Sequence, residues 1–241
     1  MKMFLLFLVV FSLYGEKIVI ASGDWEPFTS SRDENGKLLE LIVNEVFKNA
    51  GIDVEYLYYP WKRSYELVKS GKADATFPWM KTEERLKEVI YPNESILLEK
   101  SVFFHLKSTN FSFTNDADLK KYKFGGTLGY SLVGYLKDKG LEVDEVGNEI
   151  LNFKKLLANR IDVYPTSFIV GYNLINREFP PEQAALFTNS PNIISEDEYF
   201  LVFSKSSENG KSLSEKFDKG LKMLKESGRY DEIMNSFLDK K

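Results

Sequence analysis

The chain has 241 residues, of which 43% are hydrophobic and 15% aromatic, and its formal net charge is -4. This composition excludes a disordered chain, and the mildly acidic balance argues against nucleic acid or an anionic membrane as the main partner. The chain contains no cysteine, which excludes disulfides, thiol catalysis, thiolate metal sites and a lipid-modified cysteine at the amino terminus.

The amino terminus predicts an export signal over residues 1–15. A short basic start, Met-Lys-Met, precedes an apolar run over residues 4–14, which has the length of a signal-peptide core and is too short to span a bilayer. We expect cleavage near Gly15 and a periplasmic protein, although Leu13 fits the small-residue rule for cleavage poorly. An uncleaved anchor is the alternative.

The next part of the chain predicts strands and helices in alternation. Apolar residues from Leu39 to Ala50 follow the spacing of an amphipathic helix, and Gly51 stands where a left-handed cap ends one. The expected order is a strand at 17–21, this helix, a strand at 54–59, a helix that Pro60 opens and Gly71 ends, and a strand at 73–77.

The same order returns after Asp118, so the two halves repeat in architecture. Gly140 closes one predicted helix and Asn148 can cap the next. The expected elements are a strand at 123–126, a helix at 131–139, a strand at 142–146, a helix at 149–158 and a strand at 161–165. Two α/β lobes with largely parallel sheets follow from this order.

The last elements have no counterpart in the second half. A strand at 199–203 precedes an amphipathic helix built on Leu213, Phe217 and Leu221, and a short helix ends the chain. We interpret them as a return to the first lobe. The predicted limits are lobe 1 at 16–97, lobe 2 at 98–197 and the return to lobe 1 at 198–241, with two short crossings that suit a hinge.

One segment, residues 77–85, predicts a binding site. A short apolar strand runs into Pro78 and Trp79, and a segment capped by Thr82 then carries Arg85. This layout places an aromatic wall and a cation at the mouth of a cleft. It favours a receptor for a small anionic or zwitterionic solute.

Several short motifs, in this order and spacing, resemble the bacterial extracellular solute-binding proteins of family 3, the polar amino-acid-binding type. They cover nearly all of the mature chain and lie at 18–21, 25–28, 71–75, 82–85, 123–125, 159–162 and 227–233, with Gly36 before the first helix and Leu119 before the second lobe. The resemblance implies a two-lobed α/β fold of the periplasmic-binding-protein type (type II) with a two-strand hinge. It also implies a monomer that clamps a small solute between its lobes and transfers it to an ABC-type permease in the inner membrane, without enzymatic activity or a cofactor.

The resemblance also assigns roles to residues. Arg85 matches the arginine that forks onto a ligand carboxylate, and Ser131 matches a hydroxyl at a helix start that holds the same group. Trp25 and Phe28 match an aromatic position of the first loop, and Trp61 matches a residue of the side-chain pocket. The residues that we expect to contact the ligand are Arg85, Ser131, Trp25, Phe28, Trp61, Phe77, Trp79, Tyr130 and Ser167.

Two positions depart from the family pattern. The family commonly has Ser or Thr at the strand end that is Phe77-Pro78 here, and a proline has no N–H to donate. An Asp that binds the ligand's amino group is replaced by Ser167, and Asp24 or Glu26 could substitute for it. The ligand is therefore less well defined than the receptor function.

Blander interpretations stay open for several of these residues. Arg85 could pair on a helix surface with Glu84 or Glu88, the three tryptophans could pack in the core, and Ser131 could be an ordinary helix cap. His105, the single histidine, is more typical of a structural residue, and no catalytic triad or metal-binding motif is present.

Two other classes of function remain as alternatives. One is a dehydratase-like enzyme on the same scaffold, with Glu26, Asp24 or Glu196 as acid or base. The other is a soluble receptor that docks onto a membrane signalling protein.

Overall fold

The computed structural model describes residues 16–33 and 36–238. The predicted signal peptide, with its cleavage site near Gly15, lies outside the described residues. None of the helices formed by the described residues is long and apolar enough to span a membrane.

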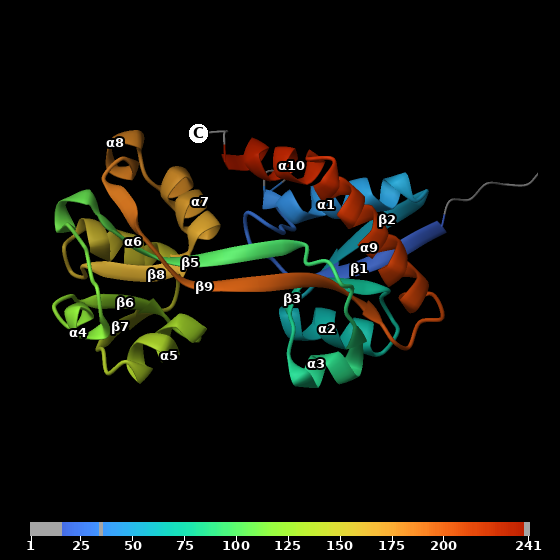
Figure 1. The fold of residues 1–241 in the computed structure, drawn as a ribbon, viewed down its shortest axis with the longest axis horizontal. Helices are drawn as coiled ribbons and strands as arrows, with labels where there is room; N and C mark the ends of the chain where they lie inside the picture. Colours follow the sequence, from blue (N-terminus) through green and yellow to red (C-terminus); the bar gives the residue numbers. More distant parts are fainter. Residues whose placement is uncertain (1–15, 34–35, 239–241) are drawn as a thin grey trace, which may run out of the picture.

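Two lobes lie at opposite ends of the molecule (Figure 1). Lobe 1 begins with β1 (Glu16–Ser22), α1 (Leu38–Asn49), β2 (Ile52–Tyr58), α2 (Trp61–Lys69), β3 (Ala75–Met80), α3 (Glu83–Glu88) and β4 (Val89–Ile90). Lobe 2 contains η2 (Lys107–Thr109), α4 (Asp116–Leu119), β6 (Phe124–Thr127), α5 (Ser131–Asp138), β7 (Val143–Val146), α6 (Glu149–Leu157), β8 (Val163–Ser167), α7 (Phe168–Glu178) and α8 (Pro181–Ala184). The chain then returns and ends with α9 (Gly210–Glu226) and α10 (Arg229–Leu238), which pack beside α1.

Two long strands, β5 (Leu97–Leu106) and β9 (Phe187–Ser204), run from one lobe into the other (Figure 1). They pair antiparallel and join both lobes into one sheet, with the strand order β2-β1-β3-β9-β5-β8-β6-β7. The pairing shifts register between Ser101 and Val102, so the ladder is irregular where the strands cross between the lobes. These strands form the predicted two-strand hinge.

Lobe 1 buries both faces of its sheet. On β9, Leu201 and Phe203 pack into the core that includes α1 and α9, whereas Phe200 and Val202 pack into a second core with α2. Successive side chains of a strand point to opposite faces, so this alternation requires helices on both sides. The apolar run at the end of β9 is therefore a buried strand between two helical layers.

Lobe 2 also buries both faces of its sheet, as the side chains of β5 show. Val102 and Phe104 pack against α6 and α7, and Phe103 packs against α4 and α5 on the other face. Because β5 supplies core side chains to lobe 2 while its start lies in the lobe 1 core, no break in the strand separates the lobes. The residue limits of the lobes, 16–97, 98–197 and 198–241, thus stay a prediction.

The predicted helix boundaries agree closely with the structure. Gly51 and Gly140 follow α1 and α5 with φ angles of 71° and 72°, a left-handed conformation that favours glycine. Asn148 caps α6 by accepting a hydrogen bond from the N–H of Leu151, at 3.2 Å. Helix caps depend on residues that are close together in the sequence, so they can be predicted from the sequence alone.

Other elements were not predicted. Strand β9 begins at Phe187, well before the predicted start at 199, and neither strand β5 nor helix α7 was predicted. The first part of β9 is rich in polar and exposed residues, which is typical of a loop until a partner strand pairs with it. Tertiary pairing with β5 decides its structure.

Candidate functional site

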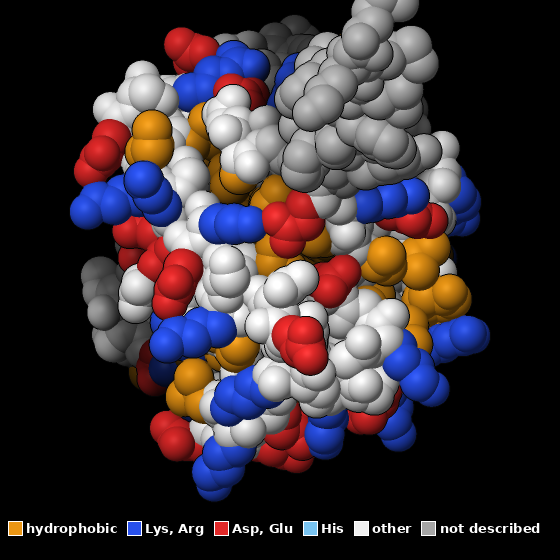
Figure 2. Space-filling model, turned by 90° about the vertical axis from the view of Figure 1, so that its right-hand side faces the viewer, with side chains coloured by type: hydrophobic (Ala, Val, Ile, Leu, Met, Phe, Trp, Pro, Cys, Tyr) orange, Lys and Arg blue, Asp and Glu red, His pale blue; other side chains and the backbone are white. Residues whose placement is uncertain are grey.

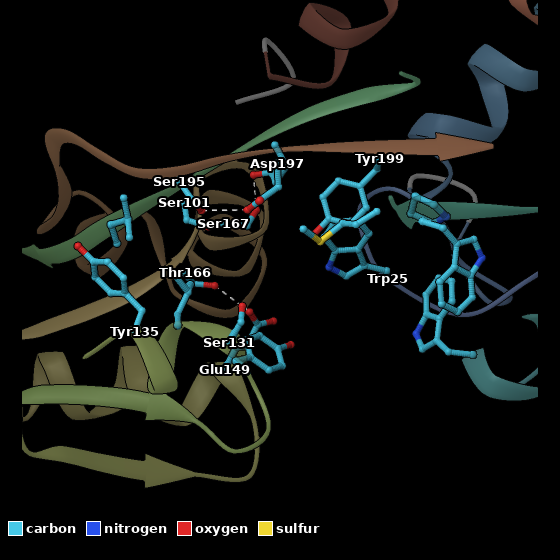
Figure 3. Close-up of a pocket in the computed structure, with 18 of the residues that line it drawn as sticks. Trp25, Ser101, Ser131, Tyr135, Glu149, Thr166, Ser167, Ser195, Asp197 and Tyr199 are labelled. Carbon is cyan, nitrogen blue, oxygen red and sulfur yellow. Dashed lines mark hydrogen bonds between the residues drawn. The ribbon is translucent and has the colours of Figure 1, made fainter. Parts of the chain in front are cut away.

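A pocket of about 660 Å³ lies between the lobes beside β5 and β9. Lobe 1 contributes Trp25, Trp61, Pro78, Trp79, Met80 and Arg85. The hinge strands contribute Glu99, Ser101, Ile194, Ser195, Asp197 and Tyr199. Lobe 2 contributes Tyr130, Ser131, Leu132, Tyr135, Glu149, Thr166 and Ser167. Figure 3 shows Trp25 and Tyr199 on one side of this space and Ser131 and Glu149 on another.

The three tryptophans form an aromatic wall on lobe 1. Trp61 meets the ring of Trp79 edge-on, with centroids 5.7 Å apart, and the indole N–H of Trp79 donates to Thr76 Oγ1 at 2.9 Å. A side-chain carbon at Gly23 would lie 2.6 Å from the Trp61 ring, so the glycine makes room for it. All three indoles are half-buried and line the pocket, which places them between core and cleft.

Two other aromatic residues expected at the ligand lie in the core instead. Phe28 and Phe77 are each 0% exposed, belong to the main core of lobe 1 and do not line the pocket. The Phe28 ring packs against Trp25 at 4.6 Å. Both residues therefore support the aromatic wall from behind, because the strand and loop that carry them turn these side chains inward.

Arg85 lies in the pocket beside the aromatic wall. Thr82 caps α3 by accepting from the backbone N–H of Arg85 at 3.2 Å, and the guanidinium stacks 4.8 Å from the Trp79 ring centre. Its Nη1 donates to the Met80 carbonyl at 3.0 Å. Among the described residues no carboxylate lies within ion-pair distance of Arg85, since Glu88 binds other partners. The alternative of a surface ion pair is not seen.

The start of α5 faces the pocket, but Ser131 is not its cap. The N-cap is Tyr130, whose side chain makes no capping hydrogen bond, and Ser131 is the first helical residue. The alternative of Ser131 as an ordinary cap was therefore wrong. Its exposed hydroxyl and the first backbone N–H groups of α5 are available to an anion.

A carboxylate lies close to this helix start. Glu149, the first residue of α6, accepts a hydrogen bond of 2.9 Å from Thr166 Oγ1. Burial raises the pKa of Glu149, and its negative charge adds to burial in raising the pKa of Tyr130 to about 12. This side of the pocket is acidic and rich in hydroxyls.

Sequence reasoning missed a second carboxylate, Glu99. Its Oε1 accepts a 2.6 Å hydrogen bond from Ser167 Oγ, so a carboxylate lies beside the serine that replaces the expected Asp. Burial raises the pKa of Glu99 to about 7, although hydrogen-bond donors such as Ser167 act in the opposite direction and lower it. The available signal was a glutamate inside an apolar strand, since alternation turns Glu99 and Ser101 toward the same face.

A third carboxylate comes from β9. Asp197 on β9 lies opposite Glu99 on β5 in the register of the antiparallel strands. Its carboxylate accepts a hydrogen bond of 2.9 Å from Ser195 Oγ. Figure 3 shows Ser101, Ser167, Ser195 and Asp197 gathered beside these strands. The lining residues thus include three carboxylates and one cation, Arg85. Nothing in the sequence indicated that these residues meet.

The acidic residues proposed from the sequence lie elsewhere. Glu26 pairs with Arg177, Asp24 accepts from the backbone N–H of Ser31 at 2.6 Å, and Glu196 pairs with Lys100. None of these three acids is among the residues that line the pocket. The pocket lining therefore includes none of the acids that the sequence suggested for the amino group or for the enzyme alternative.

Histidine and metal chemistry find little support in the part of the chain that the structure describes. His105 is buried, and its Nδ1 lies 2.8 Å from the carbonyl of Leu106. No group of three or more His, Cys, Asp and Glu residues among 16–33 and 36–238 has an arrangement that could hold a metal ion.

Comparison with known proteins supports the fold and the family. The bacterial extracellular solute-binding proteins, family 3, match residues 18–240. No curated protein sequence matches the chain.

Solved structures share the fold at low sequence identity. Substrate-binding domain 2 of GlnP from Lactococcus lactis, in an open conformation, has a TM-score of 0.75 at 21% identity, over 93% of this chain and 96% of that one. An ancestral arginine-binding protein bound to arginine gives 0.63 at 24% identity, over 92% and 97%.

A third solved structure comes from a different functional context. A histidine kinase sensor domain with similarity to periplasmic binding proteins gives a TM-score of 0.68 at 18% identity, over 93% of this chain and 96% of that one. These likenesses confirm the predicted two-lobed α/β fold of the periplasmic-binding-protein type. With a family match over nearly its whole length, the chain belongs to the bacterial extracellular solute-binding proteins, family 3.

Proposed function

We propose that this chain is a receptor that binds a small carboxylate-bearing solute between its lobes and delivers it to an ABC-type permease. The observation that carries the proposal is the position of Arg85, which lines the interlobe pocket without a carboxylate partner among the described residues. A guanidinium binds a carboxylate through two parallel hydrogen bonds. The free N–H groups at the start of α5, with Ser131, would hold the same group from lobe 2.

The pocket supports binding more than catalysis. Its lining combines aromatic and apolar side chains with charged groups and hydroxyls, which can bind and orient a small solute. The outer end of lobe 1 carries interspersed acidic and basic side chains (Figure 2). This mixed surface fits an exported monomer that works with a membrane permease and not with nucleic acid.

Ligand binding by the wild-type protein and by Arg85→Ala tests the proposal. A thermal-shift screen of amino acids and small carboxylates should give a raised melting temperature for one class. We expect Arg85→Ala to weaken that binding at least about thirtyfold, because the ligand's charge then loses its partner. Arg63→Ala is the matched control, since Arg63 is exposed on α2 and lies outside the pocket.

Two results would contradict the proposal. One is a complete lack of response in the screen, and the other is unchanged affinity in a folded Arg85→Ala variant. Uptake and sensing use the same pocket, so loss of solute uptake in cells that lack this chain is the measurement that separates them.

A further inference from the structure

The carboxylate of Glu99 is incompletely satisfied at the wall of the pocket. One oxygen, Oε1, accepts the hydrogen bond from Ser167, whereas Oε2 is buried and has no hydrogen-bond partner among the described residues. The residue is 4% exposed. Buried polar atoms in folded proteins nearly always have a partner, so an unpaired carboxylate oxygen that lines a pocket points to a missing donor.

A structural role at the start of α7 explains only part of this arrangement. Ser167 caps α7 by accepting from the N–H of Val170 at 3.0 Å, and the backbone N–H groups of Phe168 and Ile169 lower the pKa of Glu99. These donors stabilise the carboxylate but leave Oε2 unpaired. The cap itself is already provided by the serine hydroxyl, so α7 does not require a charged group here.

The charges around Glu99 are unfavourable unless a cation is added. Asp197 lies directly opposite Glu99 on the neighbouring strand, and like charges at such positions repel. Glu149 adds a third negative charge to the lining, and Arg85 on lobe 1 is the one Lys or Arg among the lining residues that the structure describes. The hinge side of the pocket therefore has an excess of negative charge.

Aromatic rings complete the surroundings of this carboxylate. Trp25 and Tyr199 lie together at the hinge side of lobe 1, with ring centres 5.1 Å apart (Figure 3). Burial raises the pKa of Tyr199 to about 12, with Asp197 and Glu99 as further causes, so the phenol stays neutral at physiological pH. Neutral ring faces attract cations, and they do so more strongly where water is excluded.

We propose that Oε2 of Glu99 accepts a hydrogen bond from an ammonium group of the solute, while Ser167 fixes the orientation of the carboxylate. The inference rests on the proposed function, because it places this group in a solute held in the same pocket. An ammonium supplies both the missing donor and a compensating charge, whereas a neutral hydroxyl or amide supplies only the donor. The solute then carries its cationic end at the hinge and its carboxylate end toward Arg85.

The test measures binding of three matched sets of compounds to the whole protein at pH 8. The sets are the twenty standard L-amino acids, their analogues without the α-amino group, and their amines without the carboxylate. We expect an amine-bearing compound to bind most tightly. Glu99→Gln should weaken it at least about thirtyfold while changing the affinity of the analogue without the amine much less.

Two variants keep the test independent of folding. Glu198→Gln is the matched control, since Glu198 is an exposed acid on β9 outside the pocket. In the double variant Glu99→Gln with Ser167→Asp, the carboxylate moves to the neighbouring position, and we expect at least about a tenfold recovery of affinity for the amine. A purely structural role of Glu99 would not give such a rescue.

The possible failures are distinguishable. If an analogue without the amine binds as tightly as its parent, or if Glu99→Gln leaves the preference for the amine unchanged, the ammonium site is overturned and the receptor function stands. If no compound of the three sets binds the wild-type protein, the ammonium site and the proposed function are both overturned.

Discussion

The two sides of the pocket differ in charge and in character. Lobe 1 presents three indole rings and the guanidinium of Arg85, whereas the hinge and lobe 2 present Glu99, Asp197 and Glu149 among serine and threonine hydroxyls. A pocket with opposite charges on opposite walls does more than attract a solute, because it also fixes the direction in which a dipolar solute lies. The distribution of charge in the pocket therefore favours one orientation of such a solute.

Burial also differs between the two sides. Arg85 is half-buried and is stabilised by the Trp79 ring and the Met80 carbonyl, whereas Glu99 is almost fully buried with one unpaired oxygen. An isolated buried charge is costly, and the raised pKa of Glu99 expresses that cost. The hinge side therefore has more to gain from a ligand than the lobe 1 side.

The largest expected effect is a loss of stability when a ring behind the aromatic wall is removed. Phe77→Ala removes a fully buried ring from the lobe 1 core, so we expect a loss of about 3–5 kcal/mol in the free energy of unfolding. Urea unfolding measures this, with the half-exposed Leu98→Ala as the control, for which the change should stay within about 0.5 kcal/mol. A small loss for Phe77→Ala would show that Phe77 belongs to the pocket side after all.

The next effect is a pH dependence of the protein's stability that Glu99 causes when no ligand is bound. Burial raises the pKa of Glu99 in the folded protein to about 7, above the ordinary value of 4.5 for a glutamate. Between pH 4.5 and 7 the folded protein therefore holds a proton that the unfolded chain has lost. The stability of the wild type should fall as the pH rises from 4.5 to 7 and then level off. Glu99→Gln removes this cost, so we expect the variant to be more stable at pH 8, by up to about 3 kcal/mol.

Below pH 4 the two proteins should unfold with the same free energy, since Glu99 is then protonated in both states. Unfolding by urea at both pH values, with Glu198→Gln as the control, measures the difference. A gain of the same size at both pH values would show that the effect is not one of charge.

A smaller effect should appear in ligand binding. If an ammonium binds ionised Glu99, its affinity should fall about tenfold between pH 8 and pH 6, because the ionised fraction of a group with a pKa of about 7 falls by that factor. The groups that face Glu99 are Ser167 at the start of α7, Asp197 and Tyr199 on β9, and Tyr230 on α10. Burial raises the pKa of both tyrosines to about 12, so they do not titrate in this range.

Titration calorimetry at the two pH values measures this dependence. Glu99→Gln should abolish it. A dependence that persists in the variant would assign the titration to another group, with Glu149 the first candidate because burial raises its pKa as well.

The smallest effect distinguishes the two helix starts on the lobe 2 side. Asn148 caps α6, so Asn148→Ala should cost about 1 kcal/mol of stability, whereas Ser131 caps nothing and Ser131→Ala should stay within about 0.5 kcal/mol. Ser131→Ala should nevertheless weaken binding of a carboxylate ligand. Thermal unfolding and calorimetry on the two variants measure both quantities, and equal losses of stability would contradict the assignment.

Much of the fold could be predicted from local sequence. The periodicity of α1, the left-handed glycines after α1 and α5, and the caps at Thr82 and Asn148 involve residues within a few positions of one another. Such local patterns favour the same helix and the same helix ends in any protein that contains them. The repeated order of strands and helices then restricts the architecture to two α/β lobes.

The candidate site was predictable in part. The expected residues Trp25, Trp61, Trp79 and Arg85 of lobe 1 line the pocket, as do Tyr130, Ser131 and Ser167 of lobe 2, whereas the three carboxylates were not expected there. Sequence reasoning could not separate the three tryptophans from Phe28 and Phe77, which are equally aromatic and equally close in the chain. Which rings face the core depends on how the strand and loop are turned against α1 and α9.

The family, the two-lobed α/β architecture and an aromatic wall with a cation could be predicted from the sequence, because each depends on motifs or on spacing along the chain. The acidic wall opposite depends on the fold. Glu99 and Ser167 are 68 positions apart and meet because β5 pairs with β8, and Asp197 joins them because β9 pairs with β5. Long-range strand pairing leaves no local signal, so this half of the site becomes visible only once the chain is folded.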